Sequence, residues 1–221
     1  MLQFFQQFVG INTIMYYGPD IILSTGIKVD GVDDKKLSII LNIPLAAVNA
    51  IGSTVAVFVI DNMGRRFIML RTLPGVFASL ILVAISEFLS NFFGDVDEDG
   101  NTIKTTAVVT GNYLAMVSLV LYLAFFSIGM SSTVWSVNTE IYPIHLIGTA
   151  SSLATATNWF SNFLVSTFFL DILETDSGKV IAFLLLAGFT TAAWLFIYYL
   201  LPETNGKPIN ENVNNILRKK K

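Results

Sequence analysis

The stretch FFQQFVGINTIMYYGPDII, residues 4–22, is strongly apolar, yet it carries two adjacent glutamines, an asparagine and paired tyrosines. An amide in hydrocarbon is costly unless it finds a hydrogen-bond partner, because no water is present to satisfy it. Either a neighbouring helix or a polar ligand must therefore compensate these amides. The stretch predicts a membrane helix with a polar site inside it.

The rest of the chain also has the composition of a membrane protein. Hydrophobic residues make up 53% of the 221 residues and charged residues only 13%, whereas soluble domains carry about 25% charged residues. Apolar stretches of roughly the 20 residues that a bilayer requires occur at residues 2–27, 37–60, 67–92, 111–138, 148–173 and 179–201. We therefore expect an all-α membrane protein, with a bundle of six transmembrane helices over residues 1–201 and a cytoplasmic tail over residues 202–221.

Several classes of function are disfavoured. The chain has no cysteine, which removes disulfides and thiolate metal sites. Its single histidine, His145, has no second ligand at a workable spacing, so no metal site is expected. The sequence has no basic run with interleaved aromatics, which is the pattern typical of nucleic-acid binding. The predicted spans contain no nucleophile beside a base, no metal dyad and no pair of acids, which are the groups that catalysis would require. We therefore expect no enzyme activity, no catalytic residues and no cofactor.

The distribution of cations predicts the orientation of the chain. The positive-inside rule places the more cationic loops in the cytoplasm. One side carries eight cations and the other five, and the eight are Arg65, Arg66, Arg71, Lys207, Arg218, Lys219, Lys220 and Lys221. Both termini are therefore expected in the cytoplasm.

Polar side chains line up along the predicted spans. On an ideal helix, Gln6 and Tyr17 fall within about 60° of each other, and Asn12 lies off that stripe unless the helix breaks or rotates near Gly10. A second stripe in the fifth span includes Asn158. These positions suggest one shared polar surface.

Two explanations fit such a surface. Polar residues often join membrane helices, at about 0.6–2 kcal/mol for each hydrogen bond. Alternatively, amides that both donate and accept, beside an aromatic face, suit a neutral polyhydroxylated ligand. An ion path would require charges in mid-membrane, and these are scarce here.

Five motifs resemble those of the sugar porters of the major facilitator superfamily. They are QQFVGIN followed by YY (residues 6–17), DNMGRR (61–66), W-x-x-x-x-E-I-Y-P (135–143), NWxxN (158–162) and PETNG (202–206). They occur in the family order and cover essentially the whole chain. Within the family, YLAFFSIGM (122–130), WSVNTEIYP (135–143) and an enlarged acidic loop after the third span most resemble proton-coupled myo-inositol cotransporters.

The resemblance assigns roles to individual residues. It implies hydrogen bonding or stacking to substrate by Gln6, Gln7, Asn12, Asn49, Trp135 and Asn162. Tyr16 and Tyr17 would form an outer gate, although an interfacial aromatic belt explains them equally well. Ion pairs that latch the cytoplasmic helix ends would come from Asp61, Arg65, Arg66 and Glu140.

Two departures from the family pattern would thin this latch, because Asn62 and Ile147 stand where the family has arginine. A third departure is Asn205, which stands where the tail motif has lysine.

The family has twelve spans in two six-helix halves that rock about the substrate, and this chain matches the second half. The expected function is that of a carrier half for a neutral polyol or sugar, myo-inositol above all, in the plasma membrane and with proton coupling as an option. Its partners would be the substrate, the lipid bilayer and the missing N-terminal half. A facilitative hexose transporter half and a non-transporting truncated or regulatory membrane protein are the alternatives.

Overall fold

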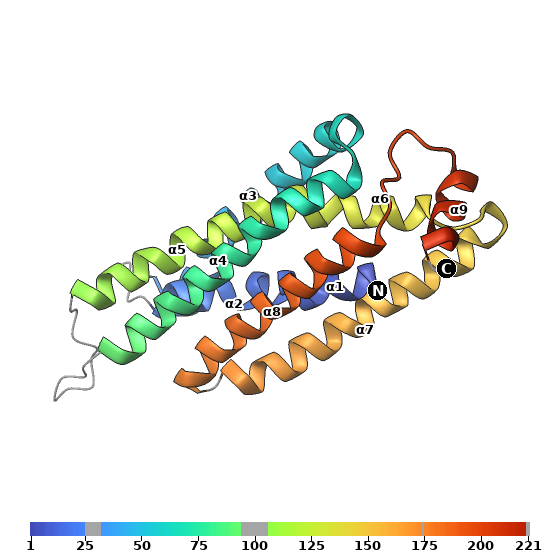
Figure 1. Ribbon diagram of the computed structural model, residues 1–221. Coiled ribbons are helices and arrows are strands. Elements are labelled where there is room, and N and C mark those ends of the chain that lie inside the picture. The colour runs from blue at the N-terminus through green and yellow to red at the C-terminus, as the bar shows by residue number, and fades with distance from the viewer. Residues whose placement is uncertain (25–31, 94–105, 174, 220–221) are drawn as a thin grey trace.

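The computed structural model describes residues 1–24, 32–93, 106–173 and 175–219. In these ranges the chain is helical and contains no strand. The enlarged acidic loop after the third predicted span and the end of the first span lie outside the described residues. Figure 1 shows an elongated bundle whose long helices run in roughly one direction.

The chain folds into α1 (Leu2–Phe8), α2 (Ile11–Ser24), α3 (Asp34–Met63), α4 (Arg65–Phe93), α5 (Thr106–Phe126), α6 (Ser132–Glu140), α7 (Ile147–Leu173), α8 (Asp176–Leu200) and α9 (Ile209–Lys219). A π-helical turn, η1 (Ser127–Ser131), joins α5 to α6, and a 3₁₀ turn, η2 (Ile144–Leu146), precedes α7. Within the described residues, α3, α4, α5 to α6, and α8 are long and apolar enough to cross a membrane.

The first predicted span is broken into α1 and α2 at Gly10. This glycine has φ +100°, a conformation that residues with a side chain rarely adopt. The hydroxyl of Tyr122 in α5 donates to the carbonyl of Val9 at 3.1 Å, beside the break. The break therefore has a glycine that permits it and a buried donor that stabilises it.

The core lies where α4 packs between α5 and α8 (Figure 1). Pro74 lies inside α4 and has no N–H to offer the carbonyl of Leu70. The indole nitrogen of Trp194 in α8 donates to that carbonyl at 3.1 Å instead. A side chain from α8 thus replaces a missing helical hydrogen bond and fixes the level at which α8 meets α4.

We expect Gly10→Ala to destabilise the bundle by about 1–3 kcal/mol, because alanine would be strained at this φ. Its Cβ would also lie 2.5 Å from Cδ1 of Leu186. The midpoint of denaturant unfolding in detergent micelles measures the effect. Gly188→Ala is the matched control, because a Cβ there would meet nothing within 4 Å; equal losses in the two variants would contradict a special role for Gly10.

Candidate substrate site and charge cluster

Five amide side chains from α1, α2 and α7 form a hydrogen-bonded group, which we call the amide cluster. Its members are Gln3, Gln6, Gln7, Asn12 and Asn158. Figure 1 shows α1 lying alongside α7, and the two helices are in contact along their length. The break at Gly10 therefore places the amides of the opening stretch against those of the fifth predicted span.

Asn158 is the centre of the amide cluster. Its Nδ2 donates to Oε1 of Gln3 at 2.7 Å and to Oε1 of Gln6 at 2.7 Å, and its Oδ1 accepts from Nε2 of Gln7 at 3.0 Å. Its side chain is buried, as are those of the three glutamines. Asn158, which the sequence analysis placed on the second polar stripe, thus connects Gln3 with the two glutamines that the resemblance assigned to substrate.

Gln6 also connects the amide cluster to the π-helical turn. Its Nε2 donates to the carbonyl of Met130 at 2.9 Å and to that of Ser131 at 3.3 Å. A π-helical turn interrupts the regular i to i+4 ladder and often occurs at functional sites. The amide of Gln6 supplies a donor to carbonyls at this irregular point.

The other predicted substrate residues lie outside the amide cluster. Asn49 in α3 accepts from the hydroxyl of Ser127 at 2.7 Å. Ser127 is the first residue of the π-helical turn that precedes α6. Asn162 in α7 accepts from Ser166 on its own helix at 3.2 Å. Trp135 lies on α6 with 40% of its surface exposed. The structure thus brings Gln6, Gln7 and Asn12 together and leaves these three residues at separate places.

Burial divides the six predicted substrate residues into two groups. Gln6 and Gln7 are buried inside the bundle, whereas Asn12, Asn49 and Asn162 are half-buried and Trp135 is exposed. Gln7 still has unused capacity, because its Nε2 donates once and its Oε1 accepts once, from Asn12 at 2.8 Å. Asn12 thus connects the buried Gln7 to a half-buried position.

The two tyrosines predicted as a gate lie on α2. Tyr16 is 53% exposed and Tyr17 is half-buried, and their rings meet edge to face with centroids 6.5 Å apart. Tyr16 is therefore placed to move without disturbing the core.

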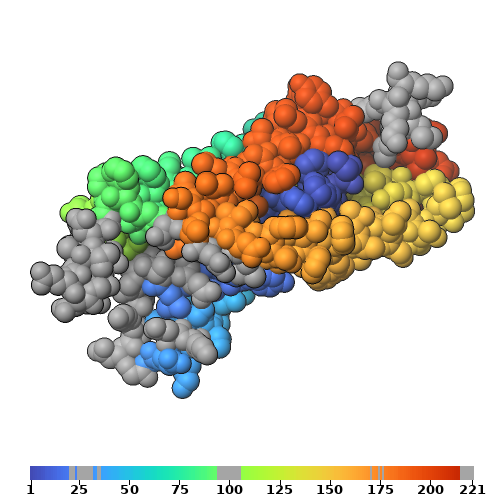
Figure 2. Space-filling view, turned by 90° about the horizontal axis from the view of Figure 1, so that it is seen from below, coloured from blue at the N-terminus to red at the C-terminus, as the bar shows by residue number. Residues whose placement is uncertain are grey.

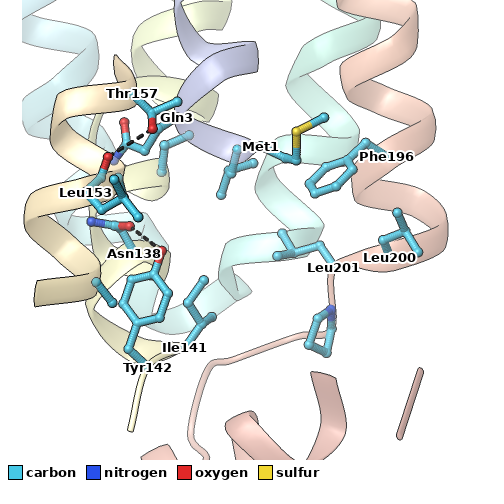
Figure 3. Close-up of a pocket in the computed structure, with 15 residues that line it drawn as sticks. Met1, Gln3, Asn138, Ile141, Tyr142, Leu153, Thr157, Phe196, Leu200 and Leu201 are labelled. Atoms are coloured by element: carbon cyan, nitrogen blue, oxygen red, sulfur yellow. Dashed lines mark hydrogen bonds between the residues drawn. The ribbon is translucent and has the colours of Figure 1, made fainter. Parts of the chain in front are cut away.

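A cavity with a volume of about 450 Å³ lies elsewhere, near Met1. Figure 2 shows α1 in blue at the surface between α7 and α8, and Figure 3 shows the side chains that line the cavity. They are mainly apolar, with Gln3 the one member of the amide cluster among them. Partial burial raises the pKa of the Tyr142 phenol. Its hydroxyl donates to Oδ1 of Asn138 at 3.2 Å (Figure 3). None of the six predicted substrate residues lines this cavity.

The predicted latch forms a charge cluster around Arg65, at the junction of α3 and α4. Its Nη2 lies 2.9 Å from Oδ1 of Asp61 and 2.9 Å from Oε1 of Glu140. Its Nη1 donates to Oδ1 of Asn205 at 2.6 Å. Asn205 stands where the tail motif of the sugar porters has lysine, and its amide oxygen accepts from Arg65. The tail of this chain therefore contacts the ends of α3 and α4.

Arg66 does not join this cluster. Its Nη2 donates to the carbonyl of Tyr198 at 2.7 Å, and its guanidinium lies over the Tyr198 ring, 5.9 Å from the centroid. A cation at the C-terminal end of a helix meets its unsatisfied carbonyls and the negative end of its dipole. Arg66 therefore ties the start of α4 to the end of α8.

Glu203 is a member of the charge cluster that sequence reasoning missed. Its carboxylate accepts from the backbone N–H groups of Arg65 at 2.8 Å and Arg66 at 3.0 Å, which are free donors at the start of α4. Next to it, the hydroxyl of Thr204 donates to Oε2 of Glu140 at 2.6 Å. The glutamate of PETNG was a signal in the sequence, but its capping role depends on the tail folding back over 137 residues.

We expect Arg65→Lys to destabilise the protein by about 1–3 kcal/mol, because an ammonium cannot reproduce the planar fork that reaches two carboxylates and two carbonyl-type oxygens. Unfolding in detergent micelles measures this. Arg71→Lys is the control, because Arg71 is exposed and has no carboxylate partner among the described residues; its expected change is within about 0.5 kcal/mol. A loss at position 65 no larger than at position 71 would contradict the geometry.

Comparison with known proteins places this arrangement in a family. A family model described as "Sugar (and other) transporter" matches residues 1–215. The membrane transporter D1 of Leishmania donovani is 36% identical over 219 residues, which cover 99% of this chain and 37% of the relative. The proton myo-inositol cotransporter of Homo sapiens is 30% identical over 281 residues, which cover 95% of this chain and 42% of the relative.

The fold agrees with these matches. A solved structure of a proton:xylose symporter of the major facilitator superfamily superposes with a TM-score of 0.76 at 24% identity, covering 97% of this chain and 41% of the symporter. The chain thus spans less than half the length of these relatives. The chain belongs to the sugar transporter family, and it shares its all-helical fold with about two fifths of that solved symporter of the major facilitator superfamily.

Proposed function

We propose that this chain is the C-terminal half of a transmembrane carrier for a neutral polyol or sugar, with myo-inositol as the first candidate. The observation that carries the proposal is that Asn12, Asn49, Trp135 and Asn162, on α2, α3, α6 and α7, are uncharged residues with accessible side-chain area. Amides that donate and accept, together with an indole face, match the hydroxyls and C–H faces of a polyol. Similarity to the proton myo-inositol cotransporter supports the choice of candidate.

The amide cluster supports one of these residues, Asn12. Asn12 bonds to Gln7, and Gln7 bonds to the buried Asn158. A hydrogen-bonded network in a low-dielectric interior holds its outermost group in a defined orientation. Asn12 would therefore present its remaining hydrogen-bonding groups to substrate at little cost in side-chain entropy.

The charge cluster supplies the conformational part of the proposal. Arg65 with Asp61 and Glu140 joins the ends of α3, α4 and α6, and Glu203 and Asn205 add the tail. Rocking the two halves of a carrier past each other requires contacts at one end to loosen. The strength of this cluster would therefore bias the equilibrium between outward-facing and inward-facing states without contact to substrate.

The remaining parts of the proposal follow from the family. The carrier would work by alternating access in the plasma membrane, with both termini in the cytoplasm and the missing N-terminal half as its partner. Proton coupling would depend on an acidic group in that half. A catalytic activity has no support in the chemistry of the described residues.

Co-expression with the N-terminal half of the proton myo-inositol cotransporter, followed by uptake of labelled inositol and glucose, tests the proposal. We expect uptake only when both halves are present, with inositol preferred and with loss of uptake when a protonophore removes the proton gradient. Co-purification of the two halves controls for assembly.

The other outcomes are equally informative. An assembled pair without uptake would reject the carrier in favour of a non-transporting regulatory membrane protein. Preference for glucose would favour a facilitative hexose transporter half, and uptake that is indifferent to the protonophore would remove the proton coupling. Uptake by this chain alone would reject the need for a partner half.

A further inference from the structure

A second cavity lies between α4 and α8. It has a volume of about 170 Å³ and is lined by Leu73, Pro74, Phe77, Thr190, Thr191 and Trp194. None of the proposed substrate residues is on either helix. We call this cavity the α4–α8 groove.

The groove offers almost only apolar surface. The hydroxyls of Thr190 and Thr191 donate to carbonyls of their own helix, at 2.8 Å and 3.1 Å, and the indole N–H of Trp194 is used by Leu70. Phe77 is 40% exposed at its edge. With its polar side-chain groups already bonded, the groove suits a hydrocarbon chain better than a hydrophilic ligand.

A cation lies one helical turn before the groove, toward the end of the bundle that holds the charge cluster. Arg71 is exposed, and its guanidinium stacks over Phe67 at 5.1 Å from the ring centroid. Among the described residues no carboxylate lies within ion-pairing distance of it. Because Trp194 bonds to Leu70, Arg71 and the mouth of the groove lie at the same level.

The aromatic residues around this point match a membrane interface. Trp194 stacks on Tyr198 with ring centroids 5.2 Å apart, and Tyr199 is 66% exposed next to it. Tryptophan and tyrosine gather where headgroups meet hydrocarbon. Along α4 and α8, the cation and the aromatic residues therefore lie nearer the charge cluster, and the apolar groove lies further from it.

We propose that the α4–α8 groove binds one anionic phospholipid, whose phosphate pairs with Arg71 while part of an acyl chain occupies the groove. Charge complementarity identifies the headgroup, since a guanidinium without a carboxylate partner forms bidentate hydrogen bonds with phosphate. The apolar groove begins near Arg71 and continues away from the charge cluster, so the part of the lipid that it would hold is an acyl chain. A regulatory lipid at this position would contact the two helices that Arg66 joins, at a distance from the proposed substrate surface.

The test compares lipid retention by the full chain in detergent, measured by native mass spectrometry with equimolar phosphatidylserine and phosphatidylcholine of identical acyl chains. We expect about a fivefold preference for phosphatidylserine, the size expected for one cation near a lipid surface. Arg71→Gln should abolish the preference, and Arg71→Lys should retain most of it. Thr191→Trp, which fills the groove without removing an interhelical bond, should reduce retention of both lipids.

Lys207→Gln is the matched control, because it removes the same charge from the same end of the bundle but away from the groove. A preference that survives Arg71→Gln, or that falls equally with Lys207→Gln, would overturn the site in favour of general charge attraction. Unchanged retention in Thr191→Trp would overturn the role of the groove, and dimers in place of bound lipid would assign it to a second copy of the chain. These outcomes concern lipid binding alone, so they are independent of whether the chain transports a polyol.

Discussion

Asn158→Leu is expected to lower the free energy of unfolding by about 3 kcal/mol, one of the largest effects of any single substitution in this chain. The change removes the partner of Gln3, Gln6 and Gln7 at once. Interhelical hydrogen bonds in membrane proteins contribute about 0.6–2 kcal/mol each, and the glutamines left behind are buried without water. Unfolding in detergent micelles by denaturant titration measures the loss.

Asn162→Leu is the control for this prediction. It lies one turn further along α7, has the same chemistry and is half-buried, but its Oδ1 accepts only from Ser166 on the same helix. Its expected change is below about 1 kcal/mol. If Asn162→Leu destabilised the protein as much as Asn158→Leu, the amide cluster would be no more important than any polar residue of α7.

Trp135→Ala is expected to weaken polyol binding about thirtyfold in the assembled transporter. The exposed indole can cover one face of a ring-shaped substrate, and losing about 80 Å² of buried apolar surface costs about 2 kcal/mol. Equilibrium binding of labelled inositol to co-purified halves measures the affinity. Because Trp135 is only 40% exposed and its truncation also removes packing, the unfolding midpoint of the variant is measured in parallel, so that a loss of stability is not counted as a loss of affinity.

Ser166→Ala provides the comparison for Trp135→Ala. The hydroxyl of Ser166 donates within its own helix at 3.2 Å, so its removal should change the affinity by less than about threefold. Comparable losses in the two variants would mean that the substrate surface is assigned to the wrong residues.

The helices could be predicted from the sequence because their cause is local. A run of about 20 apolar residues must form a helix in a bilayer, where each backbone group needs a partner within its own segment. Among the described residues, helices α3, α4, α5 to α6, and α8 are long and apolar enough to cross a membrane. The break at Gly10 was one of two options for placing Asn12, and glycine is the residue that tolerates φ +100°.

The candidate site was only partly predictable, because it depends on contacts between distant segments. Asn158 and Gln7 are 151 positions apart, and Arg65 and Asn205 are 140 apart. Arg65 and Arg66 are adjacent in the sequence, but Arg66 bonds to the end of α8 and Arg65 joins the charge cluster. A local sequence pattern cannot predict this difference. The capping role of Glu203 and the position of the α4–α8 groove arise in the same way.

By itself, the sequence determined the class of protein, the succession of helices and the residues from which a neutral polar site can be built, since hydropathy and hydrogen-bonding capacity belong to each side chain. Only the tertiary structure decided which amides are occupied with one another and which remain accessible. A side chain has a limited number of donors and acceptors, and the packing of α1 against α7 determines how many of them the protein itself uses.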